Sequence, residues 1–540
     1  MDKPYGDSLC PFRLTELWHE DKIRGAIVVL SEQNLSLSSH QLNEIGSFIW
    51  KLCDGKNSVR DIALSILSEC EGQQPEYQSV RDDIIAFLEQ LRHKGLVQWD
   101  DGDSVDVLLV MPPFPSVYAL KSVKTPEYSA PPLGLCYLAS VLRLHDFKVS
   151  ILDMHQNANM PEDIISKCRK LRPKIIGITA TTPTYPNAEL IARLARAFDS
   201  NVVTVIGGAH ATCLPDECIK SGAFDYVCVG EGEYTLLELT EALIRKTGDA
   251  GNIPGLVTLD SNRDVHFAGV RERVSDLDSI PYPARDLLDL DSYYQKGSII
   301  SSRGCPFNCN YCACAVISGR TYRTHSVNYV LNEIQDVSAK YGYKYFDFHD
   351  DCFNLDSQRV FELCSEIKSR KMDIEWGCFC RAAQFTPAMA KAMAGAGCKV
   401  IQFGVESGNQ TVLTKIKKST TLRQIEDAVI AAKEAKIKHI VCGFIIGHPE
   451  DTEDTVTDTI NFGLRLSELG ATRLTLSLLT PYPGTEVFLN MKQYGITLLE
   501  DNWEKYTFSR VVMETKNLPK ERLRELYSIG IGLFLQATQK

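Results

Sequence analysis

The sequence predicts an α/β protein that combines a winged-helix-like N-terminal module, a doubly wound parallel sheet and a partial (β/α)6 barrel. Three observations support this prediction. The chain of 540 residues is long enough for three to five domains at roughly 100–200 residues each. Short apolar runs alternate with helical patterns from residue 106 to residue 246, and the alternation resumes at residue 299. The first 100 residues differ, because two strand-like runs precede three helices.

The composition is typical of a soluble globular protein, with 44% hydrophobic and 24% charged residues. A net charge of -11 argues against a mainly electrostatic nucleic-acid binder. We find no run of 18 apolar residues and no signal-peptide pattern at the N-terminus, so we expect a cytoplasmic protein without a membrane span. Eighteen cysteines in a chain of this length indicate reduced thiols with one metal site.

Residues 1–100 form the expected N-terminal domain. The strand-like runs and the first helix are expected at Gly25–Leu30, Asn34–Ser38 and His40–Cys53. Ser58 and Ser79 are expected to cap two further helices, because an aspartate follows each serine three residues later. Such a module could bind DNA, but its 10 basic and 16 acidic side chains would repel phosphate. Protein or peptide binding is therefore favoured.

Residues 105–250 predict a doubly wound parallel sheet. Its strands are expected at Val107–Val110, Lys148–Leu152, Ile175–Thr179, Val202–Ile206 and Tyr226–Val229. A ligand of such a sheet lies across the carboxyl ends of the strands. Residues 251–294, with a hairpin-like run and a proline-containing loop, are interpreted as a linker.

Residues 295–500 predict the partial barrel, and residues 501–540 a C-terminal helical tail. The barrel strands are expected at Ile299–Ser301, Tyr345–His349, Ile374–Phe379, Val400–Val405, Ile440–Ile446 and Leu474–Leu479. In barrels of this kind the loops after the strands carry the chemistry.

The loop after the first barrel strand contains Cys305, Cys309 and Cys312 with the spacing C-x3-C-x2-C. Three thiolates can hold three irons of a [4Fe–4S] cluster and leave the fourth iron open to a small ligand. A zinc site would need a fourth ligand, and scattered buried thiols would not produce this spacing. The loop therefore predicts an iron–sulfur cluster, with Cys314 as a structural thiol nearby.

Together with four further motifs, this loop resembles the radical S-adenosylmethionine (SAM) superfamily between residues 299 and 488. The motifs are an aromatic residue before the third cysteine, an acidic pair after the second strand, a Glu-Ser pair after the fourth strand and a glycine-rich segment after the fifth. The acidic pair replaces a Gly-Gly-Glu segment of the family. Arg381 follows the third strand as a further candidate. The resemblance implies these SAM-binding residues: Tyr311, Asp350, Asp351, Arg381, Glu406, Ser407, Gly443, Gly447 and Pro449.

The family assigns these positions to different parts of SAM. Tyr311 and the glycine-rich segment would contact the adenine. The acidic pair, Asp350 and Asp351, would contact the methionine amino group. Glu406 and Ser407 would bind the ribose or the carboxylate, which Arg381 could also bind. Close packing at the glycines and a solvated loop at the aspartates are the structural alternatives.

The middle domain carries four glycine-containing or threonine-containing segments at the ends of its strands. In this order, and joined to such a barrel, they resemble the cobalamin-binding domain of one large class of radical SAM enzymes. The resemblance implies these cobalamin-binding residues: Pro132, Leu133, Gly134, Thr179, Thr181, Gly207, Gly208, Gly230, Glu231, Gly232 and Glu233. A dinucleotide site is disfavoured, because no G-x-G-x-x-G follows the first strand.

Cobalamin-dependent methyl carriers often place an Asp-x-His-x-x-Gly motif after the first strand, where this chain has Met111–Pro115. His155 follows the second strand and lacks the motif's glycine, so we interpret it as an ordinary loop residue. His210 is interpreted as a packing residue. The resemblance therefore implies cobalamin bound without a histidine ligand.

The N-terminal domain resembles the small PqqD-like domains that bind leader peptides of ribosomally made, modified peptides. The resemblance is carried by the hairpin before Leu37 and by Phe48–Gly55, Val59, Ile62, Leu88, Leu91 and Gly95–Val97. In that family the leader adds as a strand to the sheet. Apolar residues at helical spacing, such as Trp50, Ile62, Phe87 and Leu88, are expected to belong to the core.

Taken together, the resemblances imply a cobalamin-dependent radical SAM methyltransferase that modifies an unactivated carbon of a ribosomally made peptide. One SAM would methylate cobalamin, and a second would be cleaved to the 5′-deoxyadenosyl radical that abstracts hydrogen from the substrate. No catalytic acid or base is implied. The implied partners are a precursor or leader peptide and a one-electron donor such as flavodoxin or ferredoxin, without nucleic acid or membrane.

Other functions remain open. An epimerase, cyclase or rearrangement enzyme could use the same cofactors, also on a non-peptide natural product. A methylthiotransferase is disfavoured, because Cys136, Cys168 and Cys213 do not form one clear additional cluster motif. A cobalamin or redox sensor without catalysis is disfavoured by the complete cysteine loop.

Overall fold

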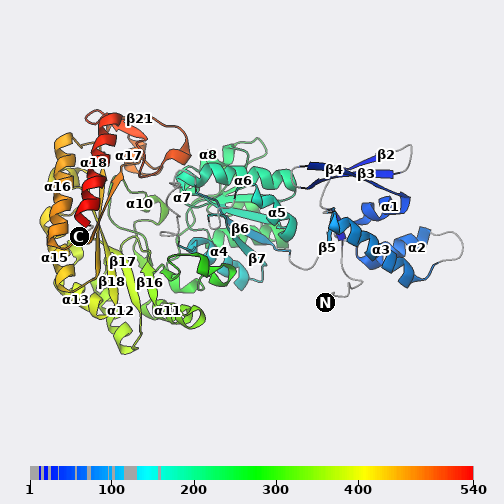
Figure 1. Ribbon diagram of the computed structural model, residues 1–540, viewed down its shortest axis with the longest axis horizontal. Coiled ribbons are helices and arrows are strands. Elements are labelled where there is room, and N and C mark those ends of the chain that lie inside the picture. Colours follow the sequence, from blue (N-terminus) through cyan, green and yellow to red (C-terminus); the bar gives the residue numbers. More distant parts are fainter. Residues whose placement is uncertain are drawn as a thin grey trace. The chain divides into compact units, whose positions relative to one another are not determined.

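The computed structural model describes residues 11–13, 18–21, 26–33, 36–54, 57–69, 75–94, 96–99, 104–114, 130–155 and 160–538. The chain divides into two compact units: residues up to 104 with residues 166–172, and the rest of the chain. Figure 1 labels the elements of both. Within the described ranges, no helix has both the length and the apolar character needed to cross a membrane.

The N-terminal unit combines an antiparallel sheet of order β2-β3-β4 with three helices, and β1 pairs antiparallel with β5. Its strands are β1 Pro11–Arg13, β2 Trp18–Asp21, β3 Ala26–Gln33, β4 Ser36–Leu42 and β5 Val97–Trp99. Its helices are α1 Glu44–Leu52, α2 Val59–Glu69 and α3 Tyr77–His93.

Three of the four residues expected in the core of this unit belong to it, whereas Phe87 is only partly buried and packs against it. Trp50, Ile62 and Leu88 are fully buried in one apolar cluster. The first helix begins later than predicted, because His40 belongs to β4 and Asn43 caps α1 with its side chain. The expected glycines at positions 55 and 95 lie outside the described residues.

One of the two expected N-caps is confirmed. The Ser58 hydroxyl accepts from the Asp61 amide at 3.2 Å, and the Asp61 carboxylate accepts from the Ser58 amide at 2.8 Å. The prediction at Ser79 is wrong, because α3 begins at Tyr77 and Ser79 lies inside its first turn. A helix begins at the first residue with helical backbone dihedral angles, which here is Tyr77, and Ser79 lies two residues beyond it.

The second unit contains a seven-stranded sheet of order β12-β11-β10-β9-β8-β6-β7. The strands are β6 Val107–Met111, β7 Val149–Asp153, β8 Ile175–Thr179, β9 Val203–Gly207, β10 Tyr226–Cys228, β11 Leu256–Leu259 and β12 Val265–Phe267. The first five are parallel, with β6 between β7 and β8. This is the doubly wound arrangement that the sequence predicts.

Helices connect the parallel strands, and the hairpin β11–β12 pairs antiparallel with the β10 edge. The hairpin expected within the linker thus extends the sheet. The helices are α4 Leu133–Leu144, α6 Tyr185–Phe198, α7 Ala209–Cys213, α8 Pro215–Lys220 and α9 Glu233–Thr240. Helix α5, Asp163–Leu171, follows β7, and its residues from 166 onward are grouped with the first unit. Figure 1 shows α4 and α6 near this sheet.

The barrel is a six-stranded parallel sheet of order β13-β16-β17-β18-β19-β20. Its strands are β13 Ser298–Ile299, β16 Tyr345–Phe348, β17 Glu375–Cys380, β18 Cys398–Glu406, β19 His439–Ile446 and β20 Arg473–Leu478. Its larger helices are α11 Val327–Tyr341, α12 Ser357–Ser369, α13 Pro387–Gly395, α15 Leu422–Glu434, α16 Glu453–Leu469 and α18 Lys520–Thr538. Both sheets together confirm the predicted fold class.

Smaller elements follow the first, fourth and sixth barrel strands. They are β14 Ser302–Arg303, α10 Cys314–Ile317, β15 Arg323–Thr324, α14 Gln410–Lys415, α17 Glu486–Leu489, β21 Ile496–Leu498 and β22 Met513–Thr515. β14 pairs with β15, so the cysteine loop lies within a short hairpin-like excursion.

Alternation of burial along the barrel strands separates the core from the lumen. In β18, Ile401, Phe403 and Val405 are buried in the cluster shared with the surrounding helices. Val400 and Gln402 alternate with them and line a cavity of about 1000 Å³ toward the amino-terminal ends of the barrel strands. The C-terminal helix α18 completes the core, because its Phe534 ring packs 5.3 Å from that of Phe444.

Candidate cofactor site

A cavity of about 450 Å³ lies between the doubly wound sheet and the mouth of the barrel. On the sheet side it is lined by segments that follow the carboxyl ends of the parallel strands, and the barrel contributes residues that follow β13 and β16. The cavity is therefore bounded by the functional edges of both parallel sheets. All the predicted cobalamin-binding residues except Leu133 and Thr181 line it.

Glycine positions shape the sheet side of this cavity. A Cβ atom at Gly208, whose φ is +92°, would lie 2.6 Å from the Thr179 hydroxyl oxygen. At Gly230, whose φ is +82°, a Cβ atom would meet nothing within 4 Å, because the position faces open space. Gly208 thus allows close packing against Thr179, and the bare backbone at Gly230 leaves room for a ligand.

The two predicted residues outside the cavity have local roles. Leu133 is buried in the sheet's apolar core at the start of α4. The Thr181 backbone N–H donates to the Thr184 hydroxyl at 2.9 Å, which caps a short 3-10 helix. Their contact with cobalamin remains a prediction.

Two acidic residues of the Gly230–Glu233 segment use their carboxylates within the protein. Glu233 accepts from Arg303 at 2.7 Å, and Glu231 accepts from Arg323 at 2.7 Å. Their side chains thus border the cavity while pairing with arginines from the barrel.

The histidines considered from the sequence lie elsewhere. His210 is fully buried and stacks on Tyr185 with ring centroids 4.2 Å apart, and burial lowers its pKa to about 4. His155 packs edge-on against Phe114 at 4.8 Å. Of the described histidines, His349 lines the cavity, and its Nε2 lies 3.0 Å from the Ser298 hydroxyl oxygen.

The cysteine loop is more exposed than the other thiols. Cys305 and Cys309 are partly buried and Cys312 is exposed, whereas most described cysteines are buried. The Cys314 thiol donates to Cys305 and thereby lowers the pKa of Cys305 to about 6. No three potential ligands among the described residues surround a single metal ion. A [4Fe–4S] cluster does not require that, because each thiolate binds a different iron.

The acidic pair holds the backbone that leads into this loop. Asp350 is buried and accepts from the Ser301 and Ser302 amides at 2.6 and 3.1 Å and from the Ser301 hydroxyl at 2.6 Å. Asp351 accepts from the Gly304 amide at 2.9 Å and lines the cavity. Of the two, Asp351 is thus the aspartate beside the ligand space, and Asp350 is an anchor.

In the barrel, Glu406 ends β18 with a φ of +71°. Its carboxylate accepts from the Lys418 ammonium at 2.7 Å, and that ammonium lies 3.5 Å from the Tyr311 hydroxyl oxygen. Lys418 was not predicted, because a lysine in a run of lysines gives no sequence signal.

His448 lies in the predicted adenine segment and is fully buried. Its ring lies edge-on to Tyr311 with centroids 5.6 Å apart. Neither ring nitrogen has a hydrogen-bond partner within the described part of the chain. Buried polar atoms are normally paired, so a polar ligand such as a purine fits beside them. Gly447, with φ +90°, donates its amide to Asp451 at 2.9 Å and shapes this turn.

The remaining predicted SAM residues lie on or after β17, β18 and β19. Ser407 lies 3.1 Å from the Thr459 hydroxyl and is fully buried, and Gly443 pairs with Gly404 across β19 and β18. The Arg381 guanidinium lies 3.5 Å above the Phe307 ring and 3.9 Å from the Cys309 sulfur. It also donates to the Lys418 carbonyl. Arg381 therefore contacts the cysteine loop itself. The SAM contacts of these residues, and that of Pro449, remain predictions.

Comparison with known families assigns three segments of the chain. Residues 27–97 match the family of coenzyme PQQ synthesis protein D, residues 121–240 the B12 binding domain and residues 299–463 the radical SAM superfamily. An uncharacterised methyltransferase, PH0819 of Pyrococcus horikoshii, is 37% identical over 428 residues, which cover 78% of this chain and 90% of that protein.

The chain belongs to the cobalamin-binding radical SAM enzymes. The predicted family and its three cofactors, a [4Fe–4S] cluster, SAM and cobalamin, are confirmed. This radical SAM enzyme is of the cobalamin-dependent methyltransferase type.

Two further similarities are more distant, one to a sequence and one to a solved structure. The anaerobic magnesium-protoporphyrin IX monomethyl ester cyclase of Rubrivivax gelatinosus is 25% identical over 73% of this chain and 71% of that protein. The radical SAM methyltransferase TsrM from Kitasatospora setae, solved with cobalamin and a [4Fe–4S] cluster, has the same fold, with a TM-score of 0.65 and 20% identity. That comparison covers 80% of this radical SAM chain and 89% of TsrM.

Proposed function

We propose that this radical SAM enzyme methylates an unactivated carbon of a ribosomally made peptide. The observation that carries the proposal is the PqqD-like segment, residues 27–97, on the same chain as the cobalamin and radical SAM modules. A domain of this kind is expected to bind a leader peptide, and the catalytic unit would then act on the attached core peptide. A precursor peptide and a one-electron donor protein such as flavodoxin or ferredoxin are the proposed partners.

The N-terminal sheet offers a suitable surface. β2 and β4 are its edge strands in the described residues, so each leaves one side of its backbone without a strand partner there. A leader peptide can add to such an edge through main-chain hydrogen bonds. Trp50 and Leu88 are buried in the core and cannot contact a peptide. We therefore propose that the leader peptide binds at the edge of the sheet.

The site geometry supports the chemistry. When bound, the cluster supplies an electron that cleaves SAM to a carbon radical, and cobalamin carries the methyl group. The residues of this chain would bind and orient these groups. Cys305, Cys309 and Cys312 would hold the cluster, and Tyr311 and Glu406 would bind SAM. The segments at Gly207 and Gly230 would bind cobalamin. The apolar cavity walls would exclude water from the reacting atoms.

The test is to express the enzyme with a short peptide encoded beside its gene, under low oxygen and with cobalamin, and to weigh the peptide intact. We expect a gain of about 14 Da per methylation. The gain should vanish in Cys309→Ala and persist in Cys364→Ala, whose thiol is buried in the core away from the loop. An unchanged peptide with all three cofactors bound would contradict peptide methylation.

A second function is favoured by the similarity to a cyclase. Ring closure or epimerisation would use the same cofactors without adding a methyl group. Loss of two hydrogen masses would indicate cyclisation. Uptake of deuterium at carbon from deuterated water would indicate epimerisation.

A further inference from the structure

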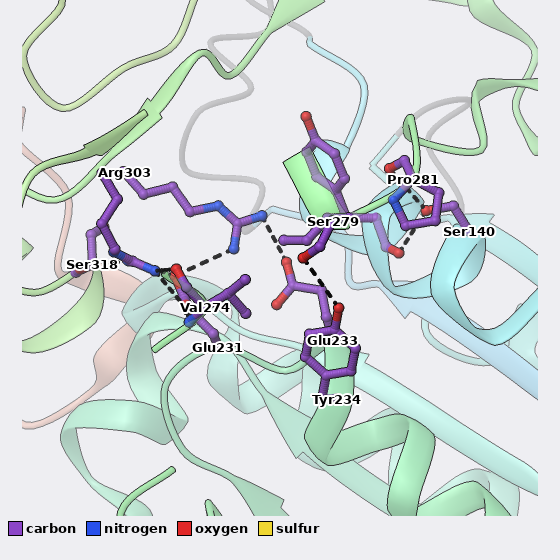
Figure 2. A network of polar contacts seen from close by, with 12 residues as sticks. Ser140, Glu231, Glu233, Tyr234, Val274, Ser279, Pro281, Arg303 and Ser318 are labelled. Atoms are coloured by element: carbon purple, nitrogen blue, oxygen red, sulfur yellow. Dashed lines mark hydrogen bonds and ion pairs between the residues drawn. The ribbon is translucent and has the colours of Figure 1, made fainter. Parts of the chain in front are cut away.

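The barrel and the doubly wound sheet are joined by a buried ionic network beside the cavity. Arg303 donates to Glu233 at 2.7 Å and to Glu231 at 3.3 Å, and Arg323 donates twice to Glu231, at 2.7 and 3.0 Å. Figure 2 shows Arg303 reaching from its strand to both glutamates. The four side chains are only 7–13% exposed.

Such a network is not explained by stability alone. The desolvation of buried ions offsets much of the energy gained from their attraction. A role that fits such pairs is to hold the groups they join in one geometry. The guanidinium of Arg303 also lies 5.4 Å from the centroid of the Tyr137 ring, another cavity-lining residue. Arg303 is thus held on two sides by the sheet that bears the cobalamin-binding segments.

The backbone of Arg303 is held just as firmly by the barrel. The preceding Ser302 amide donates to Asp350, and the following Gly304 amide donates to Asp351. The next residue is Cys305, the first cluster ligand. A shift of the Gly230–Glu233 segment would therefore be transmitted through the Arg303 side chain to the backbone beside the cluster.

We propose that Arg303 is a positioning residue that sets the distance and orientation between the iron–sulfur cluster and cobalamin. Its fork of donors bridges two carboxylates of the cobalamin-side loop, while its own backbone forms the approach to Cys305. Arg323 supports this function by fixing Glu231. The proposal rests on the two cofactors of the family and is independent of the proposed peptide substrate.

A lysine cannot replace Arg303 in this function. Its ammonium is a point charge on a flexible stem and cannot reproduce the planar bidentate bridge to Glu231 and Glu233. Arg303→Lys keeps the positive charge, so it separates positioning from charge neutralisation. Arg271→Lys is the matched control, because Arg271 is also largely buried and pairs with Glu238 of α9 but does not line the cavity.

The experiment measures the cluster–cobalamin distance by pulsed dipolar electron paramagnetic resonance, with the cluster reduced and cobalamin as cob(II)alamin. The holoenzyme is used without substrate, so failure of the peptide proposal does not affect the result. We expect one narrow distance in the native enzyme and in Arg271→Lys. In Arg303→Lys we expect a broadened or displaced distribution with both cofactors still bound.

A second readout is available once any substrate is known. The ratio of 5′-deoxyadenosine to modified product should rise by about 10- to 100-fold in Arg303→Lys, because displacement of reacting groups by about 1 Å costs rate on this scale. A purely structural role would lower both products together.

A native-like narrow distance in Arg303→Lys would overturn the proposal. Loss of cobalamin at an unchanged melting temperature would also overturn it, since Arg303 would then be a binding residue. If Arg303→Lys does not fold, Glu233→Gln is measured instead. This variant removes one charge of the bridge while keeping a hydrogen-bond acceptor. A broadened or displaced distance distribution would again support the proposal, and a native-like narrow distance would overturn it.

Discussion

The ammonium of Lys418 lies 2.7 Å from the carboxylate of Glu406, and both side chains are almost excluded from solvent, at 8% and 12% exposure. Glu406 has the left-handed φ of +71°, which is costly for a residue with a side chain. Since the ion pair holds Glu406 at the end of β18, Lys418 fixes the position of this carboxylate near the Tyr311 hydroxyl.

The first prediction concerns this pair. Lys418→Met keeps the length of the side chain but leaves the Glu406 carboxylate buried without its partner. We expect the free energy of unfolding to fall by about 3 kcal/mol, as for other broken buried pairs. SAM affinity should weaken by at least about tenfold, or about 1.4 kcal/mol. Thermal unfolding and calorimetric titration of the reconstituted enzyme measure the two effects.

Lys417→Met provides the control. Lys417 is the neighbouring lysine, and its exposed ammonium pairs with Glu486 at 2.6 Å. Exposed pairs contribute less than about 1 kcal/mol, so this variant should unfold like the native enzyme and bind SAM unchanged. Equal losses in both variants would contradict a specific role of Lys418.

The second prediction concerns the glycine-lined wall. A Cβ atom at Gly207 would be 3.6 Å from Cys228, an ordinary contact, so the sheet tolerates a larger residue there. Gly207→Val would place its methyl groups in the cavity and should remove cobalamin while leaving the iron content unchanged. Visible absorption reports cobalamin, and iron analysis reports the cluster.

Gly532→Val is the matched control on α18, where a Cβ atom would meet nothing within 4 Å. It should retain both cofactors. Full cobalamin occupancy in Gly207→Val would show that cobalamin does not lie against this wall.

Local sequence patterns suffice to propose those parts of the candidate site that consist of short contiguous motifs. The spacing of Cys305, Cys309 and Cys312 is fixed by one loop, and the segments at Gly207 and Gly230 follow strands of strong apolar periodicity. Both types of feature are determined by neighbours in the chain. Features of this kind can therefore be predicted from the sequence alone.

Residues whose role depends on contacts with parts of the chain far away in sequence cannot be predicted from local patterns. Arg303 pairs with residues about seventy positions away, and Lys418 meets Tyr311 across 107 positions. Arginine and lysine are common surface residues, so their type alone carries no signal. For the same reason Asp350 looked like a ligand residue in the sequence, although its carboxylate is used by Ser301 and Ser302.

The third prediction concerns Asp350. Its carboxylate accepts three hydrogen bonds from the segment before Cys305, and an asparagine would supply one acceptor oxygen in place of two. Asp350→Asn should therefore lower the iron and sulfide content per chain and destabilise the fold by about 3 kcal/mol. Asp347→Asn is the control on β16, the strand that precedes Asp350, where the carboxylate accepts from the Tyr345 hydroxyl at 3.0 Å. A normal cluster content in Asp350→Asn would exclude the anchoring role.

The last prediction concerns the pH dependence of stability at His210. This imidazole is fully buried between Tyr185 and Trp503, with ring centroids 4.2 and 5.4 Å away. Burial lowers its pKa from 6.5 to about 4, because the charged form would lose its hydration. The unfolded chain therefore binds a proton at His210 below pH 6.5, whereas the folded chain binds it only near pH 4.

As the pH falls from 6.5 to 4, the unfolded state alone gains this proton, so stability decreases over that window and is fully present above it. The loss attributable to His210 reaches up to about 3 kcal/mol. His210→Phe keeps an aromatic ring between Tyr185 and Trp503 but cannot bind a proton, so its melting temperature should fall less steeply across this pH range. His266→Gln, at an exposed histidine of β12, should keep the native slope. Parallel pH profiles for the native protein and His210→Phe would show that another group controls acid stability.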